Sequence, residues 1–192
     1  MSLNKKSIQS IKKAQKHCFK AKSFDTLELE NDLNLELNYI IAKPRMATYI
    51  EFSTKIYSIY LKYFDAKDIH IYSIDEVFID LSSYLEKYKL SAYELLTKVL
   101  LDILHTSKIT ATAGIGTNLY LAKIAMDILA KRQKVDENGL LIAFLDEKLY
   151  RYKLWQHKPL KDFWRIGKGI ALKLADLNIH TMGDLARFSL KH

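Results

Sequence analysis

The chain has 192 residues, 49% of them apolar, with only 6 glycines and 2 prolines, a composition typical of a globular protein with a hydrophobic core. No apolar run approaches the ~20 residues that span a bilayer, and the lysine-bearing N-terminus lacks the apolar stretch of a signal peptide, so we expect a soluble, cytoplasmic protein. The formal net charge of +8 favours a polyanionic partner, either nucleic acid or an anionic membrane surface.

The charge is unevenly distributed along the chain. Seven lysines and no acidic residue lie between Lys5 and Lys22, and the acidic stretch DTLELENDLNLE follows. After Lys148, basic residues outnumber acidic ones about three to one. The single cysteine, Cys18, cannot form an intrachain disulfide, which agrees with a reducing compartment, and the lack of CxxC or His-Cys spacing argues against a structural zinc site.

The first third of the chain predicts two helices with a strand between them. A helix is expected over 5–19, and ELNYIIAKP (36–44) reads as a short strand that Pro44 stops, because proline cannot donate to a ladder. The segment 48–64 has apolar residues at helical spacing, which predicts an amphipathic helix. That apolar stripe consists of Tyr49, Phe52, Ile56, Ile59, Tyr60 and Tyr63.

Two β-branched and aromatic runs follow, IHIYSI (69–74) and VFIDL (77–81), separated only by Asp75 and Glu76. They predict either two strands folded on each other or one long strand, and propensity does not decide, since Asp-Glu is not a favoured hairpin turn pair. Ser91 with Glu94 predicts a capping box before an apolar helix over 93–104.

The remaining pattern predicts a strand over 109–116, a helix over 119–131 capped by Thr117 or Asn118, and a strand over 138–145. The order ββαβαβ is that of a split α/β sandwich with helices on one face of a sheet. Beyond about residue 148 the pattern changes to short basic helices, which predicts a second unit.

Asp75 and Glu76 form the first candidate site. Two carboxylates at a strand end can bind a divalent cation such as Mg²⁺, which prefers oxygen ligands. Adjacent side chains of an ideal strand point to opposite faces, so both carboxylates reach one ion only if the backbone turns there. The alternative is a solvated pair in an exposed turn.

The second candidate site lies in RIGKGIALKLADLNIHTMGDLA (165–186), where Gly167 and Gly169 bracket Lys168 between two short helical segments. Glycines at such a hairpin let backbone N–H groups approach a phosphate, and Lys168 and Lys173 add positive charge. This helix-hairpin-helix pattern predicts contact with the DNA backbone without sequence readout. The alternative is a tight turn in a small helical bundle.

The third candidate is GIGTNLYLAKIAMDILAKR (114–132), a glycine-bearing turn from strand to helix. It lacks GxGxxG and GKS or GKT, which excludes Rossmann and P-loop sites. Lys123 and Lys131 lie eight residues apart on nearly the same side of the predicted helix, and spacing alone favours a solvated face. The histidines show no metal-ligand spacing, and no GxSxG nucleophile pattern occurs.

These three motifs, in this order and with these gaps, resemble the Y-family DNA polymerases, the UmuC/DinB group also called ImpB/MucB/SamB proteins. YSIDEVFIDLS is similar to the family's catalytic palm signature, TATAGIGTNLYLAKIAMDILAK to its next block, and PLKDFWRIGKGIALKLADLNIHTMGDLA to the thumb's helix-hairpin-helix. AKPRMATYIEFSTKIYSIYLKY resembles the segment that returns from fingers to palm. In detail the chain looks closer to the UmuC-like branch than to the DinB branch.

The resemblance implies roles for individual residues. Asp75 would be a Mg²⁺ ligand, Glu76 the acidic partner that helps to hold the metal at the primer 3′ end, and Lys131 a contact to the incoming triphosphate. In many relatives that lysine lies one position earlier, which is a rotation of about 100° on a helix. In the family's two-metal site, ions about 3.5 to 4 Å apart activate the 3′ hydroxyl and stabilise the departing pyrophosphate.

The resemblance also implies an α+β fold: partial fingers over 1–45, an incomplete ferredoxin-like palm over 46–147, and a partial helical thumb over 148–192. The family's first palm strand, which carries another metal-binding aspartate, has no match here, and neither has the little-finger domain. Because that strand lies inside the sheet, we expect unpaired backbone on its neighbours. We also expect little or no polymerase activity from this chain.

The sequence therefore leaves three hypotheses. The first is a fragment of a translesion DNA polymerase that serves DNA repair in a bacterial cytoplasm, with primer-template DNA, dNTPs and Mg²⁺ as partners; a sliding clamp or regulatory subunit would belong to the full-length protein. The second is a non-catalytic protein that binds DNA through the hairpin around Lys168. The third is another palm-type enzyme such as a nucleotide cyclase, against which the thumb-like hairpin argues.

Overall fold

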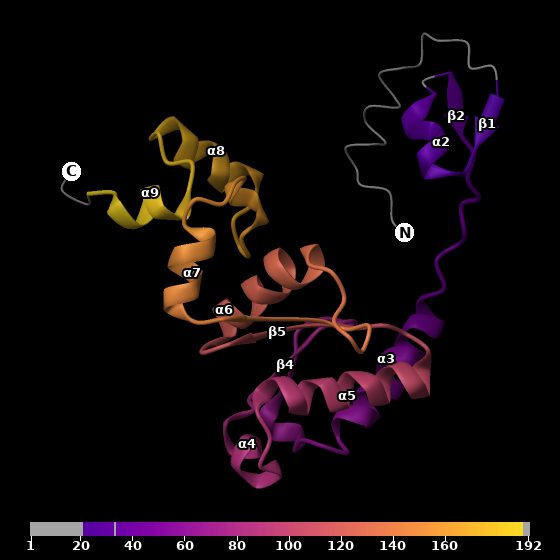
Figure 1. The fold of residues 1–192 in the computed structure, drawn as a ribbon, viewed down its shortest axis with the longest axis vertical. Coiled ribbons are helices and arrows are strands. Elements are labelled where there is room, and N and C mark those ends of the chain that lie inside the picture. The colour runs from indigo at the N-terminus through magenta and orange to yellow at the C-terminus, as the bar shows by residue number, and fades with distance from the viewer. Residues whose placement is uncertain (1–20, 33, 190–192) are drawn as a thin grey trace. The chain divides into compact units, whose positions relative to one another are not determined.

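A computed structural model describes residues 21–32 and 34–189, and the chain divides into two compact units, Met1–Arg45 and Met46–His192 (Figure 1). The helix expected over 5–19 lies outside the described residues. In the described part of the chain, every helix is too short or too polar to cross a bilayer.

The first unit contains two short parallel strands joined by a helix. Asp25 caps this helix, because its carboxylate accepts the backbone N–H groups of Leu27 and Glu28. The elements are β1 (Ala21–Ser23), α2 (Thr26–Asn31) and β2 (Leu35–Leu37).

The strand expected over 36–44 is wrong beyond Leu37. Within the described residues β1 pairs three residues with β2, and the backbone N–H of Asn38 makes the last bond, to the carbonyl of Ser23 at 2.7 Å. Ile40 and Ile41 lie exposed without regular structure. β-Branched residues favour a strand only where a neighbouring strand completes the ladder.

The second unit begins with the predicted amphipathic helix, which spans Met46–Tyr60 as α3, and η1 (Ala66–Asp68) follows. The two β-branched runs then form an antiparallel hairpin of β3 (Ile69–Ile71) and β4 (Val77–Ile79), which decides between the hairpin and the single long strand. After α4 (Ser82–Tyr88), the capping box of Ser91 and Glu94 opens α5 (Ala92–Ser107), as predicted.

The strands β5 (Thr112–Gly116) and β6 (Leu141–Leu145) are parallel, and the chain between them crosses over as a helical segment. Of the two predicted caps, Asn118 is the one used: its side chain accepts the backbone N–H of Leu121 at 2.9 Å. The crossover changes its winding along its length, from α6 (Leu119–Ile124) to the π-helical η2 (Ala125–Leu129) and the 3₁₀-helical η3 (Ala130–Arg132).

Helices cover both faces of the β5–β6 sheet, whereas the sequence predicted helices on one face only. On β6, Ile142 packs into the core formed with α3 and α5, while Ala143 and Leu145 pack into the core formed with α6. This alternation is the two-residue period of a strand buried on both faces. Figure 1 shows α5 and α6 on opposite sides of β5.

The glycines of β5 allow α6 to lie directly on the strand. A Cβ atom on Gly114 would stand 2.1 Å from the carbonyl oxygen of Ala122, and one on Gly116 would stand 2.2 Å from the nitrogen of Ala122. Both contacts are to backbone, which cannot move aside without shifting the helix. The glycine-ended strand is therefore explained by close helix packing.

We expect Gly114→Ala to lower the free energy of unfolding by about 1–3 kcal/mol, because the added methyl group overlaps the backbone of α6. Chemical denaturation would measure the change. The matched control is Gly169→Ala, which adds the same methyl group inside α8, where nothing lies within 4 Å. That control should raise stability by up to about 0.5–1 kcal/mol, and an equal loss in both variants would contradict the packing argument.

The strands of the second unit do not join into one sheet. β3 pairs only with β4, and β5 only with β6, in the part of the chain that the structure describes. Both ladders nevertheless pack on the same helical layer, since Val77 and Ile79 of β4 share a core with Ala113 and Ile115 of β5. One edge of β4 and one edge of β5 therefore carry no ladder among the described residues, and the expectation that an interior strand is missing stays a prediction.

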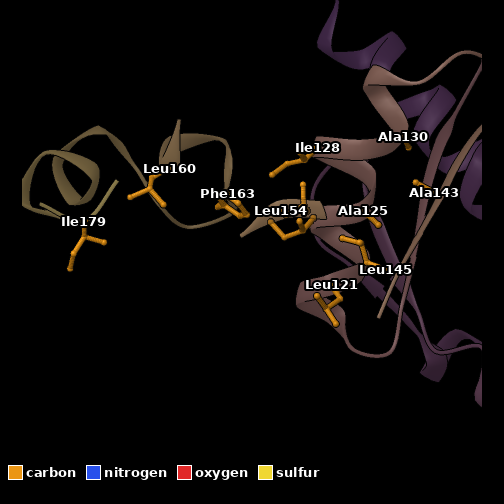
Figure 2. Packing of buried hydrophobic residues seen from close by; sticks show 11 residues of the cluster. Leu121, Ala125, Ile128, Ala130, Ala143, Leu145, Leu154, Leu160, Phe163 and Ile179 are labelled. Carbon is orange, nitrogen blue, oxygen red and sulfur yellow. The ribbon is translucent and has the colours of Figure 1, made fainter. Parts of the chain in front are cut away.

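The C-terminal part consists of short helices on a second core. Figure 2 shows Leu154, Leu160 and Phe163 continuing the cluster that Leu121 and Ile128 begin in the crossover. This continuous core attaches residues 147–187 to the β5–β6 sheet. The elements are α7 (Glu147–Leu154), η4 (Leu160–Asp162), α8 (Lys168–Asp176) and α9 (Met182–Arg187). The expected division of 46–192 into palm and thumb stays a prediction.

Candidate active site

The turn between β3 and β4 places Asp75 and Glu76 at a chain reversal. The carbonyl of Glu76 accepts the backbone N–H groups of Tyr72 and Ser73 at 3.0 and 3.1 Å, which closes the hairpin. The hydroxyl of Ser73 donates to Asp75 Oδ1 at 2.8 Å. Asp75 is exposed and Glu76 half-buried, so this backbone turn keeps two adjacent carboxylates near solvent.

Glu76 forms an ion pair with Lys123 of α6. The Nζ of Lys123 lies 2.6 Å from Oε1 and 2.7 Å from Oε2 of Glu76, so one ammonium group engages both carboxylate oxygens. Lys123 is 7% exposed, so the expectation of a solvated face is wrong for this residue. The pair joins the hairpin to the crossover helix across 47 positions of sequence.

The charges continue along the crossover. Asp127 accepts from Lys123 at 3.1 Å and, through its other oxygen, from Lys131 at 2.7 Å. Two carboxylates and two ammonium groups therefore alternate from Glu76 to Lys131. Lys123 and Lys131 lie on the same side of the helix, as their spacing predicted.

The π-helical turn η2 explains how Lys131 reaches this position. A π-helix bonds residue i to i+5, so its turn holds about one residue more than an α-turn. Because such a turn absorbs an extra residue, the eight positions from Lys123 to Lys131 make close to two turns. Lys131 lies one position later than the corresponding lysine of many relatives. The extra residue of the π-turn therefore keeps its side chain on the same side of the crossover as Lys123.

The environment of Lys123 favours its charged form. Burial opposes the ammonium group, but hydrogen bonds to Glu76 and Asp127 outweigh that effect and raise the pKa of Lys123 above its ordinary value. The side chain therefore remains a cation wherever the protein is folded at neutral pH. One feature of the sequence could have indicated that Lys123 is buried. It lies between apolar residues, of which Leu121 and Ile124 are both buried in the core.

An aromatic cluster connects the carboxylate hairpin to the C-terminal helices. Trp164, in the turn after η4, donates from Nε1 to the hydroxyl of Tyr72 at 3.0 Å. Its ring also lies 6.0 Å from Phe78 and 6.4 Å from Tyr120, measured between ring centroids. This cluster could not be predicted from the sequence, because the contact joins residues 92 positions apart.

The glycine-bearing segment Gly167–Gly169 follows Trp164 closely in the sequence, and the structure places it at the start of α8. Gly167 is the N-cap without a side-chain hydrogen bond, followed by Lys168 and Gly169 in the first turn. No atom approaches within 4 Å of a Cβ built on either glycine, so the backbone is open there. Lys173 lies five residues after Lys168, about 140° around the helix, so the two lysines do not share a face.

A second ion-pair cluster holds the end of the crossover to the loop before α8. Asp162 accepts from Arg132 at 2.6 Å and lies 2.9 Å from His157 Nε2. Burial raises the pKa of Asp162, but the hydrogen bonds from Arg132 and His157 are together stronger and hold it below its ordinary value.

This cluster predicts a stability loss in acid. A carboxyl group with a lowered pKa in the folded state stabilises the protein above its ordinary pKa, and that contribution disappears as the pH falls through the folded pKa. We expect Asp162→Asn to be less stable than wild type by about 1–3 kcal/mol at pH 7 and to lose less stability between about pH 5 and 3.

Thermal unfolding across this pH range would test the prediction. The control is Asp176→Asn, an exposed carboxylate to which the structure assigns no ion pair in the described part of the chain. Parallel stability curves for wild type and Asp162→Asn would contradict the role of Asp162.

Residues 4–127 match the model of the impB/mucB/samB family. The chain belongs to this family. The match covers the hairpin with Asp75 and Glu76 and the crossover up to Asp127, so the family resemblance based on these motifs is confirmed.

Curated relatives carry polymerase and repair names. The chain is 36% identical over 152 residues to DNA polymerase IV of Pelotomaculum thermopropionicum, covering 79% of this chain and 35% of that protein. It is 31% identical over 156 residues to UvrX, described as a UV-damage repair protein, of Bacillus subtilis, covering 79% of this chain and 34% of the relative. The chain thus spans about a third of the length of these relatives. Their names do not separate the UmuC-like from the DinB branch, so that assignment stays a prediction.

Solved structures agree with the family. An insertion ternary complex of Dbh DNA polymerase superposes with a TM-score of 0.62 at 28% identity, covering 78% of this chain and 40% of Dbh. DinB from Sulfolobus solfataricus gives a TM-score of 0.60 at 27% identity, covering 78% of this chain and 41% of that one. The mixed α and β architecture expected from the sequence is therefore confirmed, while the helix-hairpin-helix assignment stays a prediction.

Proposed function

We propose that this protein is part of a DNA-directed DNA polymerase that extends a primer 3′ end across damaged template, in translesion synthesis and DNA repair. The observation that carries the proposal is the hairpin turn at Asp75 and Glu76, which pairs with Lys123 of the crossover in a chain of this family. Primer-template DNA and dNTPs are the proposed substrates. A sliding clamp or regulatory subunit remains a prediction for a longer protein.

The hairpin offers a donor set that fits Mg²⁺. This ion is commonly bound by one or two carboxylates, completed by water and substrate phosphates. Asp75 is exposed and, among the residues that the structure describes, accepts a hydrogen bond only from the hydroxyl of Ser73, while Glu76 is engaged by Lys123. Within residues 21–32 and 34–189, no three His, Cys, Asp or Glu side chains gather as a metal site, so phosphate oxygens or a further carboxylate would complete the set.

The proposed mechanism divides the work among this chain's residues. Asp75 and Glu76 would hold Mg²⁺, which when bound supplies activation of the 3′ hydroxyl and stabilisation of the departing pyrophosphate. Lys131, half-exposed at the end of the crossover, would neutralise charge on the incoming triphosphate. The open backbone of Gly167 and Gly169, with Lys168, would hold a DNA phosphate at the start of α8.

The edges of β4 and β5 support a further element of the proposal. In the family resemblance, an aspartate-bearing strand lies in the interior of the palm sheet. β4 and β5 each pair with only one neighbour among the described strands, and both rest on the same helical layer. A strand that pairs with these two edges would supply the missing carboxylate next to the hairpin.

We expect the 192-residue chain alone to extend a primer poorly or not at all, because no three carboxylate, His or Cys side chains gather as a metal site among the described residues. A primer-extension assay with Mg²⁺ and all four dNTPs would measure this activity, and a longer family member would serve as the positive control. Robust Mg²⁺-dependent synthesis by this chain would contradict the expectation.

A second candidate function is non-catalytic DNA binding through the segment around Lys168. Lys123 neutralises one of the two hairpin carboxylates, and the described residues after Lys148 are strongly basic. These observations favour a protein that holds DNA without performing chemistry on it.

Two substitutions separate the candidates. We expect Asp75→Ala to weaken Mn²⁺ binding at least about tenfold and to leave DNA affinity nearly unchanged, because Asp75 would be a metal ligand. Lys168→Ala should weaken DNA binding several-fold and leave Mn²⁺ binding intact, because it removes one phosphate contact. Titrations with Mn²⁺ and with a labelled primer-template would measure both effects.

The control for the DNA-binding titration is the salt dependence of the wild-type affinity for DNA. Phosphate contacts release counterions, so the affinity should fall steeply as salt increases, and the slope should decrease by about one in Lys168→Ala. A flat salt response would argue against the basic C-terminal part as a DNA surface. If only Lys168→Ala has an effect, the second candidate function is the better one.

A further inference from the structure

Lys123 occupies a position that the proposed function leaves unexplained. Its side chain is 8% exposed, and its Nζ lies within 2.7 Å of both carboxylate oxygens of Glu76. The aromatic ring of Tyr72 covers it as well, 5.6 Å from Nζ to the ring centroid. A buried cation therefore holds the same oxygens that a divalent ion at the hairpin would use.

A charged side chain in this position must keep a partner. Separating a buried ammonium group from all carboxylates is costly, so a lysine with one partner would hold that partner firmly. Lys123 has a second partner, Asp127, whose Oδ2 lies 3.1 Å from Nζ. Lys123 can therefore release Glu76 without becoming an unpaired buried charge.

We propose that Lys123 is a positioning residue that serves as an internal counter-cation: it holds Glu76 in place when the hairpin is free of metal, and it transfers to Asp127 when a divalent cation binds. This inference rests on the proposed function of the hairpin as a metal site. Asp127 is the acceptor that makes the exchange possible, because its Oδ2 already faces Lys123 at 3.1 Å while its Oδ1 pairs with Lys131 at 2.7 Å.

The proposal predicts opposite effects of two substitutions on metal affinity. Lys123→Met removes a competing positive charge from Glu76, so Mn²⁺ should bind about tenfold more tightly. Asp127→Asn removes the alternative acceptor, so Lys123 should hold Glu76 more firmly and Mn²⁺ should bind more weakly. A lysine that does not compete with the metal for Glu76 would not produce a gain in metal affinity.

Electron paramagnetic resonance titration with Mn²⁺ on the full 192-residue chain would measure both affinities without requiring polymerase activity. The Asp75→Asn variant measures how much Mn²⁺ binds elsewhere than at the hairpin. The matched control is Lys55→Met, which removes a lysine that pairs with Glu51 at 2.7 Å on the exposed face of α3. This control should bind Mn²⁺ as wild type does.

The outcomes separate this inference from the proposed function. Unchanged or weaker Mn²⁺ binding in Lys123→Met, or tighter binding in Asp127→Asn, would overturn the exchange while leaving the metal site intact. Mn²⁺ binding no stronger than the Asp75→Asn background in every variant would overturn both the exchange and the metal site. If Lys123→Met does not fold, Lys123→Gln replaces it in the same comparison, because it also removes the positive charge from Glu76.

Discussion

The ion pair between Glu76 and Lys123 is the interaction on which the candidate site depends. It connects a hairpin that rests on the α3–α5 layer to a crossover helix that belongs to the second core. Breaking a buried ion pair by removing one partner leaves an uncompensated charge, whereas the intact pair satisfies both groups. The pair therefore keeps the turn that carries both carboxylates beside Lys123 of the crossover.

Close packing of the crossover on β5 makes this pair possible. Gly114 and Gly116 remove the side chains that would separate helix from strand, so Lys123 approaches the hairpin from a helix in backbone contact with its sheet. The π-helical turn then brings Lys131 onto the side of Lys123, and Asp127 pairs with both. Such turns are frequent at functional sites, and this one aligns the cations along one side of the crossover.

The C-terminal helices are held to the same site by a different kind of contact. Trp164 joins the hairpin through Tyr72 and Phe78, and it precedes the open glycine turn at Gly167 by three residues. A hydrogen bond and several ring contacts in one cluster orient the two segments more specifically than apolar area alone. The proposed metal site and the proposed DNA contact therefore lie on segments that touch, which is what joint action on one primer terminus would require.

The sequence by itself determined the local elements and the family. The apolar stripe of α3, the capping box at Ser91 and the glycine-ended strand all rest on short-range patterns, and the adjacent carboxylates carried the family signature. Only the tertiary structure decided what surrounds those carboxylates, since the partner of Glu76 lies 47 positions away and was indistinguishable from a solvated lysine by spacing. It also decided that helices cover both faces of β5–β6 and that the strand predicted over 36–44 ends at Leu37, because a ladder extends only as far as its partner strand.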